Sequence, residues 1–248
     1  MSMSIFYNEK TDNIKITSDK VTYIEDGKVV TKEFKLDYDV LIEELKNIFY
    51  SDVYKSIGGK NAFNSLLEYM SMPTACKLFY KMYCTNLKIV QPQELIDAYL
   101  SEFCIVKSNT DIVLKKEYIN DSNFILHFSY NDVAGRILRS YCSLCRELLL
   151  LAFLCKKYPE YNAYYSYYED VVNGRDIMLK HGNKRHVLAT YVDTDNSKKH
   201  RKHKINSFYS GEKLNIVEMP ANLNKNTKFI GDIAIYDEEY IISVVHNL

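Results

Sequence analysis

Residues 137–157, ILRSYCSLCRELLLLAFLCKK, decide which fold we expect for this chain. Their apolar members recur at the three- and four-residue spacing of one helix face, and Pro159 follows as a helix stop. The members of this apolar stripe are Ile137, Leu138, Tyr141, Leu144, Cys145, Leu148, Leu149 and Ala152. We therefore predict one long, well-buried helix that continues through Lys157.

The chain after this helix is predicted to be rich in strands. Residues 176–180 and 186–193 form two strand-like runs, and His181-Gly182-Asn183-Lys184 joins them as a hairpin loop. Further strands are expected at 214–217, 230–236 and 240–245. We expect residues 131–248 to form an α/β domain with a mixed sheet flanked by helices.

The chain before the helix has a different pattern. Asp26-Gly27 lies between alternating apolar residues and predicts a β-hairpin. From Tyr38 to about residue 100 the apolar period is helical, with a break at Gly58-Gly59. Short strands are expected at 103–106 and 124–128. Residues 1–130 are thus predicted to be mainly helical with an N-terminal hairpin, which makes the whole chain α+β or α/β.

Composition limits the classes of function. The 248 residues include 32 basic and 32 acidic side chains, and 47% are hydrophobic. A hydrophobic content this high excludes a disordered chain, and a net charge of zero excludes binding of a polyanion over the whole surface. The first ten residues lack a signal-peptide pattern, and the apolar run 148–155 is too short to span a membrane. We expect a cytoplasmic protein without a membrane partner.

Positive charge is concentrated in one segment, Asn196 to Lys204 (NSKKHRKHK), which carries five Lys or Arg, two His and no acid. Such a segment can neutralise several phosphates, although lysine-rich loops are also found as plain solvated surface. We expect nucleic-acid contacts from Lys198, Lys199, His200, Arg201, Lys202, His203 and Lys204. Lys180, Lys184 and Arg185 would extend this surface if the predicted hairpin folds back beside it.

Acidic residues on separate elements suggest a chemistry for this surface. Glu147 lies in the long helix, Asp176 begins the first strand, and the second strand follows the hairpin. This order resembles the PD-(D/E)XK nuclease superfamily over roughly residues 136–204, and the resemblance implies a restriction-endonuclease-like fold. In that superfamily a helical Glu, a strand Asp and a Glu-x-Lys element on the next strand bind divalent ions that activate water against a phosphodiester.

The resemblance assigns roles to particular residues. Glu147 matches the helical acid and Asp176 the strand acid, whereas the Glu-x-Lys element falls on Ala189-Thr190-Tyr191 and lacks both of its defining residues. Asp193 is then expected to supply a displaced carboxylate. Lys180 or Tyr191 is expected to orient the water or the leaving group. The implied ligands of Mg²⁺ or Mn²⁺ are Glu147, Asp176 and Asp193.

Three hypotheses for the function follow. The first is a metal-dependent nuclease or nuclease-like protein, from a mobile element or a defence system, that acts on DNA or RNA. The second is a non-catalytic nucleic-acid-binding or regulatory protein on a degenerate nuclease fold, which the missing Glu-x-Lys pair favours. The third is a protein-interaction module that uses the tyrosine-rich surface. A protein partner bound through residues 1–130 and a homodimer both remain open.

Overall fold

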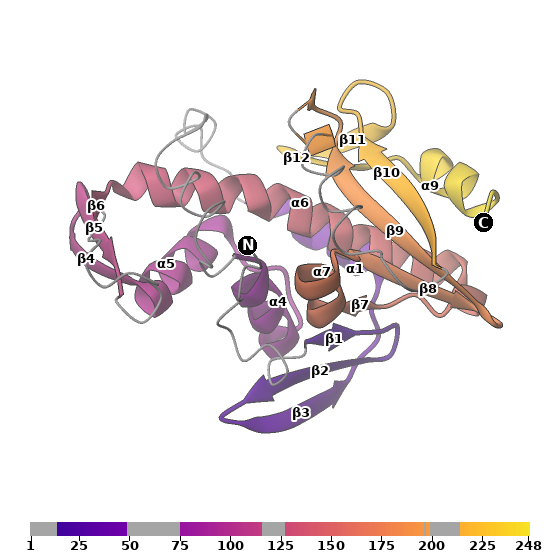
Figure 1. Cartoon of the computed structure of the whole chain (residues 1–248), viewed down its shortest axis with the longest axis horizontal. Coiled ribbons are helices and arrows are strands. Elements are labelled where there is room, and N and C mark those ends of the chain that lie inside the picture. Colours follow the sequence, from indigo (N-terminus) through magenta and orange to yellow (C-terminus); the bar gives the residue numbers. More distant parts are fainter. Residues whose placement is uncertain (1–13, 49–74, 116–126, 196, 199–213) are drawn as a thin grey trace, which may run out of the picture.

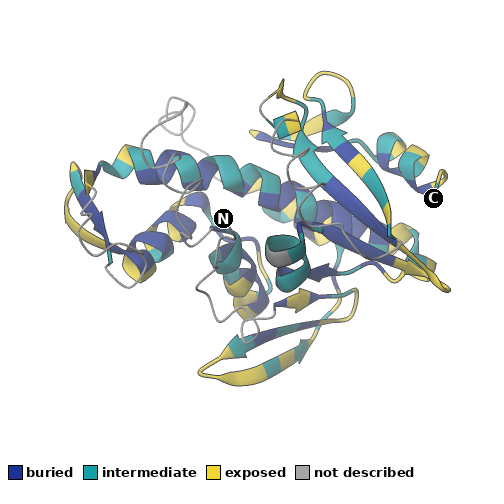
Figure 2. Cartoon of the chain, in the orientation of Figure 1, coloured by how far each residue is buried: buried dark blue, intermediate teal, exposed yellow. Residues whose placement is uncertain are grey.

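The longest helix, α6 (Tyr130–Lys157), lies at the centre of the molecule (Figure 1). The computed structural model describes residues 14–48, 75–115, 127–195, 197–198 and 214–248, with the side chain of Val172 left out. Ser129 and Asp132 cap the start of α6 reciprocally, and the helix ends before Pro159. All seven residues from Leu148 to Leu154 are buried, so this part of the helix is covered on every side (Figure 2). The predicted helix is confirmed.

A small antiparallel sheet opens the described chain. It contains β1 (Lys15–Ile16), β2 (Lys20–Glu25) and β3 (Lys28–Glu33). The turn between β2 and β3 has positive φ angles at Asp26 (49°) and Gly27 (73°), as a type I′ hairpin requires. The hairpin predicted from Asp-Gly is therefore confirmed.

Helices of the N-terminal half pack on α6. These are α1 (Tyr38–Lys46), α4 (Ala75–Asn86) and α5 (Pro92–Phe103), with Pro92 in the first turn of α5. A three-stranded antiparallel sheet follows at one end of α6, from β4 (Cys104–Ser108), β5 (Asp111–Leu114) and β6 (His127–Phe128) (Figure 1). The helical character predicted for residues 38–100 is confirmed in the described part, and Gly58-Gly59 lies outside the described residues.

The chain after α6 builds a mixed sheet. The first elements after α6 are the 3-10 turn η2 (Pro159–Tyr161), β7 (Tyr165–Ser166) and α7 (Tyr167–Asn173). The mixed sheet itself consists of β8 (Ile177–His181), β9 (Lys184–Val192) and β10 (Asn215–Ala221). Strand β9 is central, antiparallel to β8 and parallel to β10, and Tyr164 forms an antiparallel bridge with Met178 of β8. The hairpin loop is confirmed, with Gly182 at φ 58°. Helix α7 is not among the elements that the sequence predicts.

The two halves of the chain share one core. The predicted boundary near residue 130 coincides with the start of α6, but β1 pairs with β7 across it. Buried residues from Ile14 to Val245 belong to a single hydrophobic cluster. The division of the chain into two folding units at residue 130 stays a prediction. The hydrophobic core runs continuously across this position.

The C-terminal prediction is wrong in two places. The expected strand 230–236 is two strands, β11 (Thr227–Ile230) and β12 (Ile233–Tyr236), because Gly231 at φ 57° turns the chain between them. The expected strand 240–245 is part of a helix, α9 (Glu238–Val245). Asp237 caps this helix by accepting from the Glu239 N–H, which is a local signal that outweighs the β-branched composition.

The described chain is thus a mixed α+β fold in which one buried helix supports several small sheets. Within the described ranges, no helix is both long enough and apolar enough to cross a membrane.

Ile16 of β1 tests whether the N-terminal sheet belongs to the common core. Ile16 is fully buried, so we expect Ile16→Ala to lower the free energy of unfolding by about 2–5 kcal/mol in denaturant titrations. Val29→Ala is the matched control, because Val29 is 71% exposed and should change stability by no more than about 0.5 kcal/mol. Equal effects of the two substitutions would contradict a shared core.

Candidate functional site: an acid pair at Thr190

Two acidic side chains from distant parts of the sequence meet at Thr190 of β9. The Thr190 hydroxyl oxygen lies 2.9 Å from Glu147 Oε1 and 3.3 Å from Asp176 Oδ2. The backbone N–H of Thr190 also donates to Asp176 Oδ2, at 2.6 Å. We call Glu147 and Asp176 the acid pair. The structure brings the predicted helical acid and the predicted strand acid into one place.

Strand pairing explains how Asp176 reaches this position. The ladder between β8 and β9 ends where Ile177 pairs with Leu188. Beyond that point the Asp176 carboxylate, rather than a backbone carbonyl, accepts from the Thr190 N–H. A side chain thereby completes the backbone bonding at the edge of the ladder, which fixes the orientation of the carboxylate.

Sheet alternation explains how Thr190 reaches the helix. Leu188 and Thr190 project from the same face of β9, and Leu188 belongs to the hydrophobic cluster around α6. Met219, the neighbour of Thr190 on β10, is also fully buried in that cluster. Thr190 is therefore the polar residue of a core-facing row, and Glu147 of α6 is its partner.

The environment favours the neutral form of Glu147. Burial raises the pKa of Glu147 well above its usual value, and the charges of Asp176 and Asp170 raise it further, while the Thr190 hydroxyl and Arg146 oppose the shift. The hydroxyl carries one proton and cannot donate it fully to both carboxylates. A protonated Glu147 that donates to Thr190, which in turn donates to Asp176, satisfies all three groups.

More polar side chains surround the acid pair. Asp170 of α7 accepts from the Tyr165 hydroxyl at 3.1 Å and lies 3.4 Å from Cys76 Sγ. Burial raises the pKa of the Cys76 thiol well above its usual value, so this thiol stays protonated. The Tyr80 hydroxyl is buried and has no hydrogen-bond partner in the described part of the chain. The charges of Glu147, Asp170 and Asp176 all contribute to raising the pKa of Tyr80, after burial itself.

The acid pair offers the kind of ligands that bind Mg²⁺ when few protein groups contact the ion. Mg²⁺ commonly binds through one or two carboxylates, with water and substrate phosphate completing its oxygen ligands. One oxygen of each acid, Glu147 Oε2 and Asp176 Oδ1, makes no hydrogen bond in the described chain, and the orphaned Tyr80 hydroxyl lies nearby. Among the described residues there is, however, no group of three His, Cys, Asp or Glu side chains suited to a metal ion. The residues therefore fit an ion held by two carboxylates and not a closed protein cage.

Lys180 and Tyr191 lie on the sheet face opposite to Thr190. Both alternate with the core-facing residues of their strands. Tyr191 donates from its hydroxyl to Glu218 at 3.0 Å, and exposed Lys180 lines a separate pocket. The structure does not bring either side chain to the acid pair.

Asp193 lies at the end of β9, three residues beyond Thr190, or about 10 Å along a strand. Its carboxylate forms an ion pair with Lys198 at 2.6 Å and accepts from Asn222 at 3.1 Å. The hydrogen bond from Lys198 is the largest contribution that lowers the pKa of Asp193. Asp193 therefore neutralises the first lysine of the basic segment and does not join the acid pair.

The basic segment begins in helical conformation. Thr194 accepts from the Ser197 N–H as a cap, and residues 195, 197 and 198 are helical. The remaining predicted contacts, Lys199, His200, Arg201, Lys202, His203 and Lys204, lie outside the described residues. The hairpin does not fold back beside Lys198, because Lys184 and Val192 at the two ends of β9 are about 26 Å apart along an extended strand.

Sequence reasoning missed several members of this site. Thr190 occupies the unspecified position of the Glu-x-Lys element, so the motif gives it no role. Asp170 lies in the unexpected helix α7, and Cys76 and Tyr80 lie in α4, far away in sequence. The Glu-x-Lys element falls on residues 189–191 of β9, but it specifies no residue type at the position of Thr190.

In comparisons with known proteins, no family model, no curated protein and no solved structure matches the chain.

The raised pKa of Glu147 predicts how stability depends on pH. A carboxyl group with a raised pKa in the folded state contributes fully below its unfolded pKa, and stability is lost as pH rises towards the folded pKa. Glu147→Gln removes this loss. We therefore expect the free energy of unfolding of the variant, relative to the unmodified protein, to increase as the pH rises above about 4.

Denaturant titrations at a series of pH values measure this difference. Glu102→Gln is the matched control, because Glu102 is exposed and should give a difference that does not change with pH. A flat difference for Glu147→Gln would show that Glu147 titrates normally in the folded protein.

Proposed function

We propose that the protein is a metal-dependent nuclease or nuclease-like protein that cleaves DNA or RNA phosphodiesters and belongs to a mobile element or defence system. The supporting observation is the meeting of Glu147 and Asp176 at Thr190. Glu147 comes from a helix and Asp176 from the position just before strand β8, close to the arrangement that the PD-(D/E)XK resemblance implies. A preceding helix and a mixed sheet agree with the restriction-endonuclease-like fold that the resemblance implies.

Each residue of the acid pair has a separate task in this mechanism. Asp176 is held by the Thr190 N–H and presents its second oxygen, and Glu147 completes the oxygen set once it has lost its proton. Thr190 keeps the two carboxylates at a fixed separation. A bound Mg²⁺ or Mn²⁺ would supply an activated water and neutralise charge on the phosphate. Because Glu147 must ionise first, the activity should increase with pH.

A second candidate function is nucleic-acid binding without cleavage. Ala189 and Tyr191 replace the residues of the Glu-x-Lys element, and Tyr191 points away from the acid pair towards Glu218. No lysine contacts the acid pair in the described part of the chain, and the nearest cation that acts on Glu147 is the buried Arg146. An acid pair in which Glu147 stays protonated and bonded to Thr190 would be structural.

Cleavage assays with single- and double-stranded DNA and RNA, in Mg²⁺, Mn²⁺ or EDTA, separate the two candidates. We expect Glu147→Gln and Asp176→Asn to reduce metal-dependent cleavage by about 100-fold or more, because each removes a ligand charge but keeps the shape of the side chain. Asp193→Asn is the matched control and should retain activity, since Asp193 bonds Lys198 and Asn222. Cleavage that survives both acid-pair substitutions would sink the assignment, and binding without any cleavage would select the second candidate.

The basic segment predicts a salt-dependent affinity. Replacing Lys199, Arg201, Lys202 and Lys204 by glutamine should weaken nucleic-acid binding. The plot of log K against log salt should also become flatter, by about 0.7–0.9 for each phosphate that the protein no longer neutralises. Fluorescence anisotropy over a range of salt concentrations measures the slope. Lys198→Gln is the control with a smaller effect, because Asp193 already neutralises Lys198. Absence of binding even at low salt would favour a protein-interaction module instead.

A further inference from the structure

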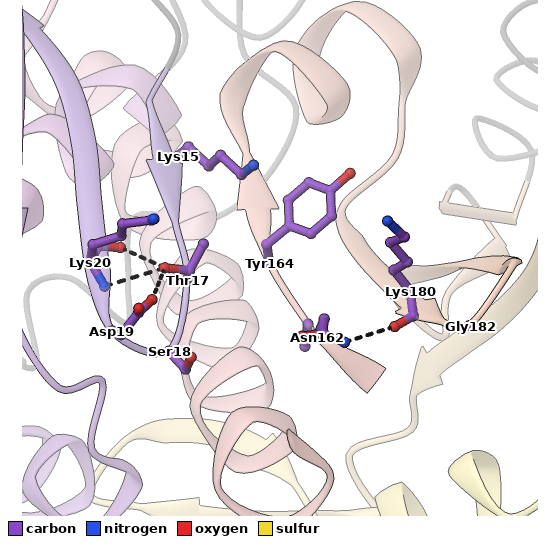
Figure 3. A pocket seen from close by; sticks show the side chains of 10 residues that line it. Lys15, Thr17, Ser18, Asp19, Lys20, Asn162, Tyr164, Lys180 and Gly182 are labelled. Carbon is purple, nitrogen blue, oxygen red and sulfur yellow. Dashed lines mark hydrogen bonds between the residues drawn. The ribbon is translucent and has the colours of Figure 1, made fainter. Parts of the chain in front are cut away.

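A pocket of about 630 Å³ opens between the N-terminal sheet and the β8–β9 hairpin. Its charged lining consists of Lys15 of β1, Lys20 of β2, Lys180 of β8 and Asp19 (Figure 3). Three lysines and one aspartate give this lining a net charge of +2. The size falls in the range of ordinary small-ligand sites.

The three lysines have no acidic partner among the described residues. Within the described ranges, no carboxylate forms an ion pair with Lys15, Lys20 or Lys180. Asp19, the one acid of the lining, accepts from the Thr17 hydroxyl at 2.8 Å as part of a tight turn. Like charges that line one pocket repel one another, and a bound anion would reduce this repulsion.

Strand pairing fixes the backbone around the pocket. Lys15 pairs with Ser166 of β7, and Tyr164 exchanges two backbone hydrogen bonds of 2.9 Å with Met178. The Lys15 ammonium lies 4.7 Å from the centre of the Tyr164 ring, and Lys180 approaches Tyr164 from the other strand (Figure 3). The Asn162 amide donates to the Lys180 carbonyl at 3.3 Å and ties the pocket floor to β8. The site is therefore preformed by strand pairing.

Positive charge continues from the pocket along the hairpin. Arg185 is the strand partner of Lys180, and Lys184 follows at the turn. The stretch from Ile177 to Val192 contains no Asp or Glu. An anion bound in the pocket would thus meet further cations along the hairpin, which suits a group that is part of a longer polyanion.

We propose that this pocket binds a phosphate group, carried by a nucleotide or by a nucleic-acid strand, through Lys15, Lys20 and Lys180. Ammonium groups are point charges suited to phosphate oxygens, and the Tyr164 ring offers a flat apolar wall beside them. The site uses no residue of the acid pair, and Lys180 lies four residues beyond Asp176, about 13 Å along the strand. It stands whether or not the protein cleaves nucleic acid.

Titration calorimetry on the full chain tests the site with three probes. These are inorganic pyrophosphate, thymidine 5′-monophosphate and a short thymidine oligonucleotide. We expect Lys15→Met and Lys180→Met each to weaken binding by about tenfold, because each removes one charged contact to phosphate. Lys28→Met is the matched control: Lys28 is an equally exposed lysine on β3 outside the pocket, and its removal should leave affinity unchanged.

The probes also distinguish the two sources of phosphate. Binding of pyrophosphate and the monophosphate that is weakened by Lys15→Met and Lys180→Met indicates a nucleotide site. Binding of the oligonucleotide alone, weakened by the same variants, indicates a strand site. Neither residue of the acid pair lines the pocket, so failure of the nuclease assignment does not affect the result. The proposal is overturned if no probe binds, or if the pocket variants bind as tightly as Lys28→Met while circular dichroism shows that they are folded.

Discussion

The structure depends on one constraint, the hydrogen bonding of a half-buried carboxyl group, Glu147, in the middle of its central helix. Helix α6 around Glu147 is covered by helices α1, α4 and α5 and by strands β9 and β12. A buried charge is costly unless it is neutralised or hydrogen-bonded. Thr190 provides the hydrogen bond, and the raised pKa of Glu147 provides the neutralisation. The position of β9 against α6 is tied to this polar contact as well as to the apolar core.

The two faces of the mixed sheet have separate chemical characters. The face of Leu188 and Thr190 packs towards α6 and contains the acid pair, whereas the opposite face carries Lys180 and Tyr191 beside buried Val187 and Ala189. Adjacent residues of a strand point to opposite faces, so Tyr191 points away from the acid pair although it directly follows Thr190. Lys180 is kept apart from Asp176 by its distance of four residues along the chain.

Charge is distributed along the sheet in the same way. The zero net charge of the chain is an average over a buried acid pair, a hairpin without acids and a basic segment beyond β9. The two basic regions lie at opposite ends of β9, and the acid pair lies between them, closer to the basic segment. One lysine of that segment is compensated locally by Asp193. An extended polyanion that followed the strand direction would meet both regions.

The sequence alone determined the elements whose signals are local: the long helix, the Asp-Gly hairpin and the β8–β9 hairpin. The resemblance to the PD-(D/E)XK superfamily also singled out Glu147 and Asp176, which lie together at Thr190 in the structure. Composition misled for residues 240–245: their β-branched side chains predict a strand, but these residues belong to a helix that Asp237 caps. Only the tertiary structure showed that Thr190 joins the two acids and that β1 pairs with β7. It also showed that Lys15 and Lys180 line one pocket. These contacts join residues far apart in the chain, and their formation depends on strand register and helix packing, which no short stretch of sequence encodes.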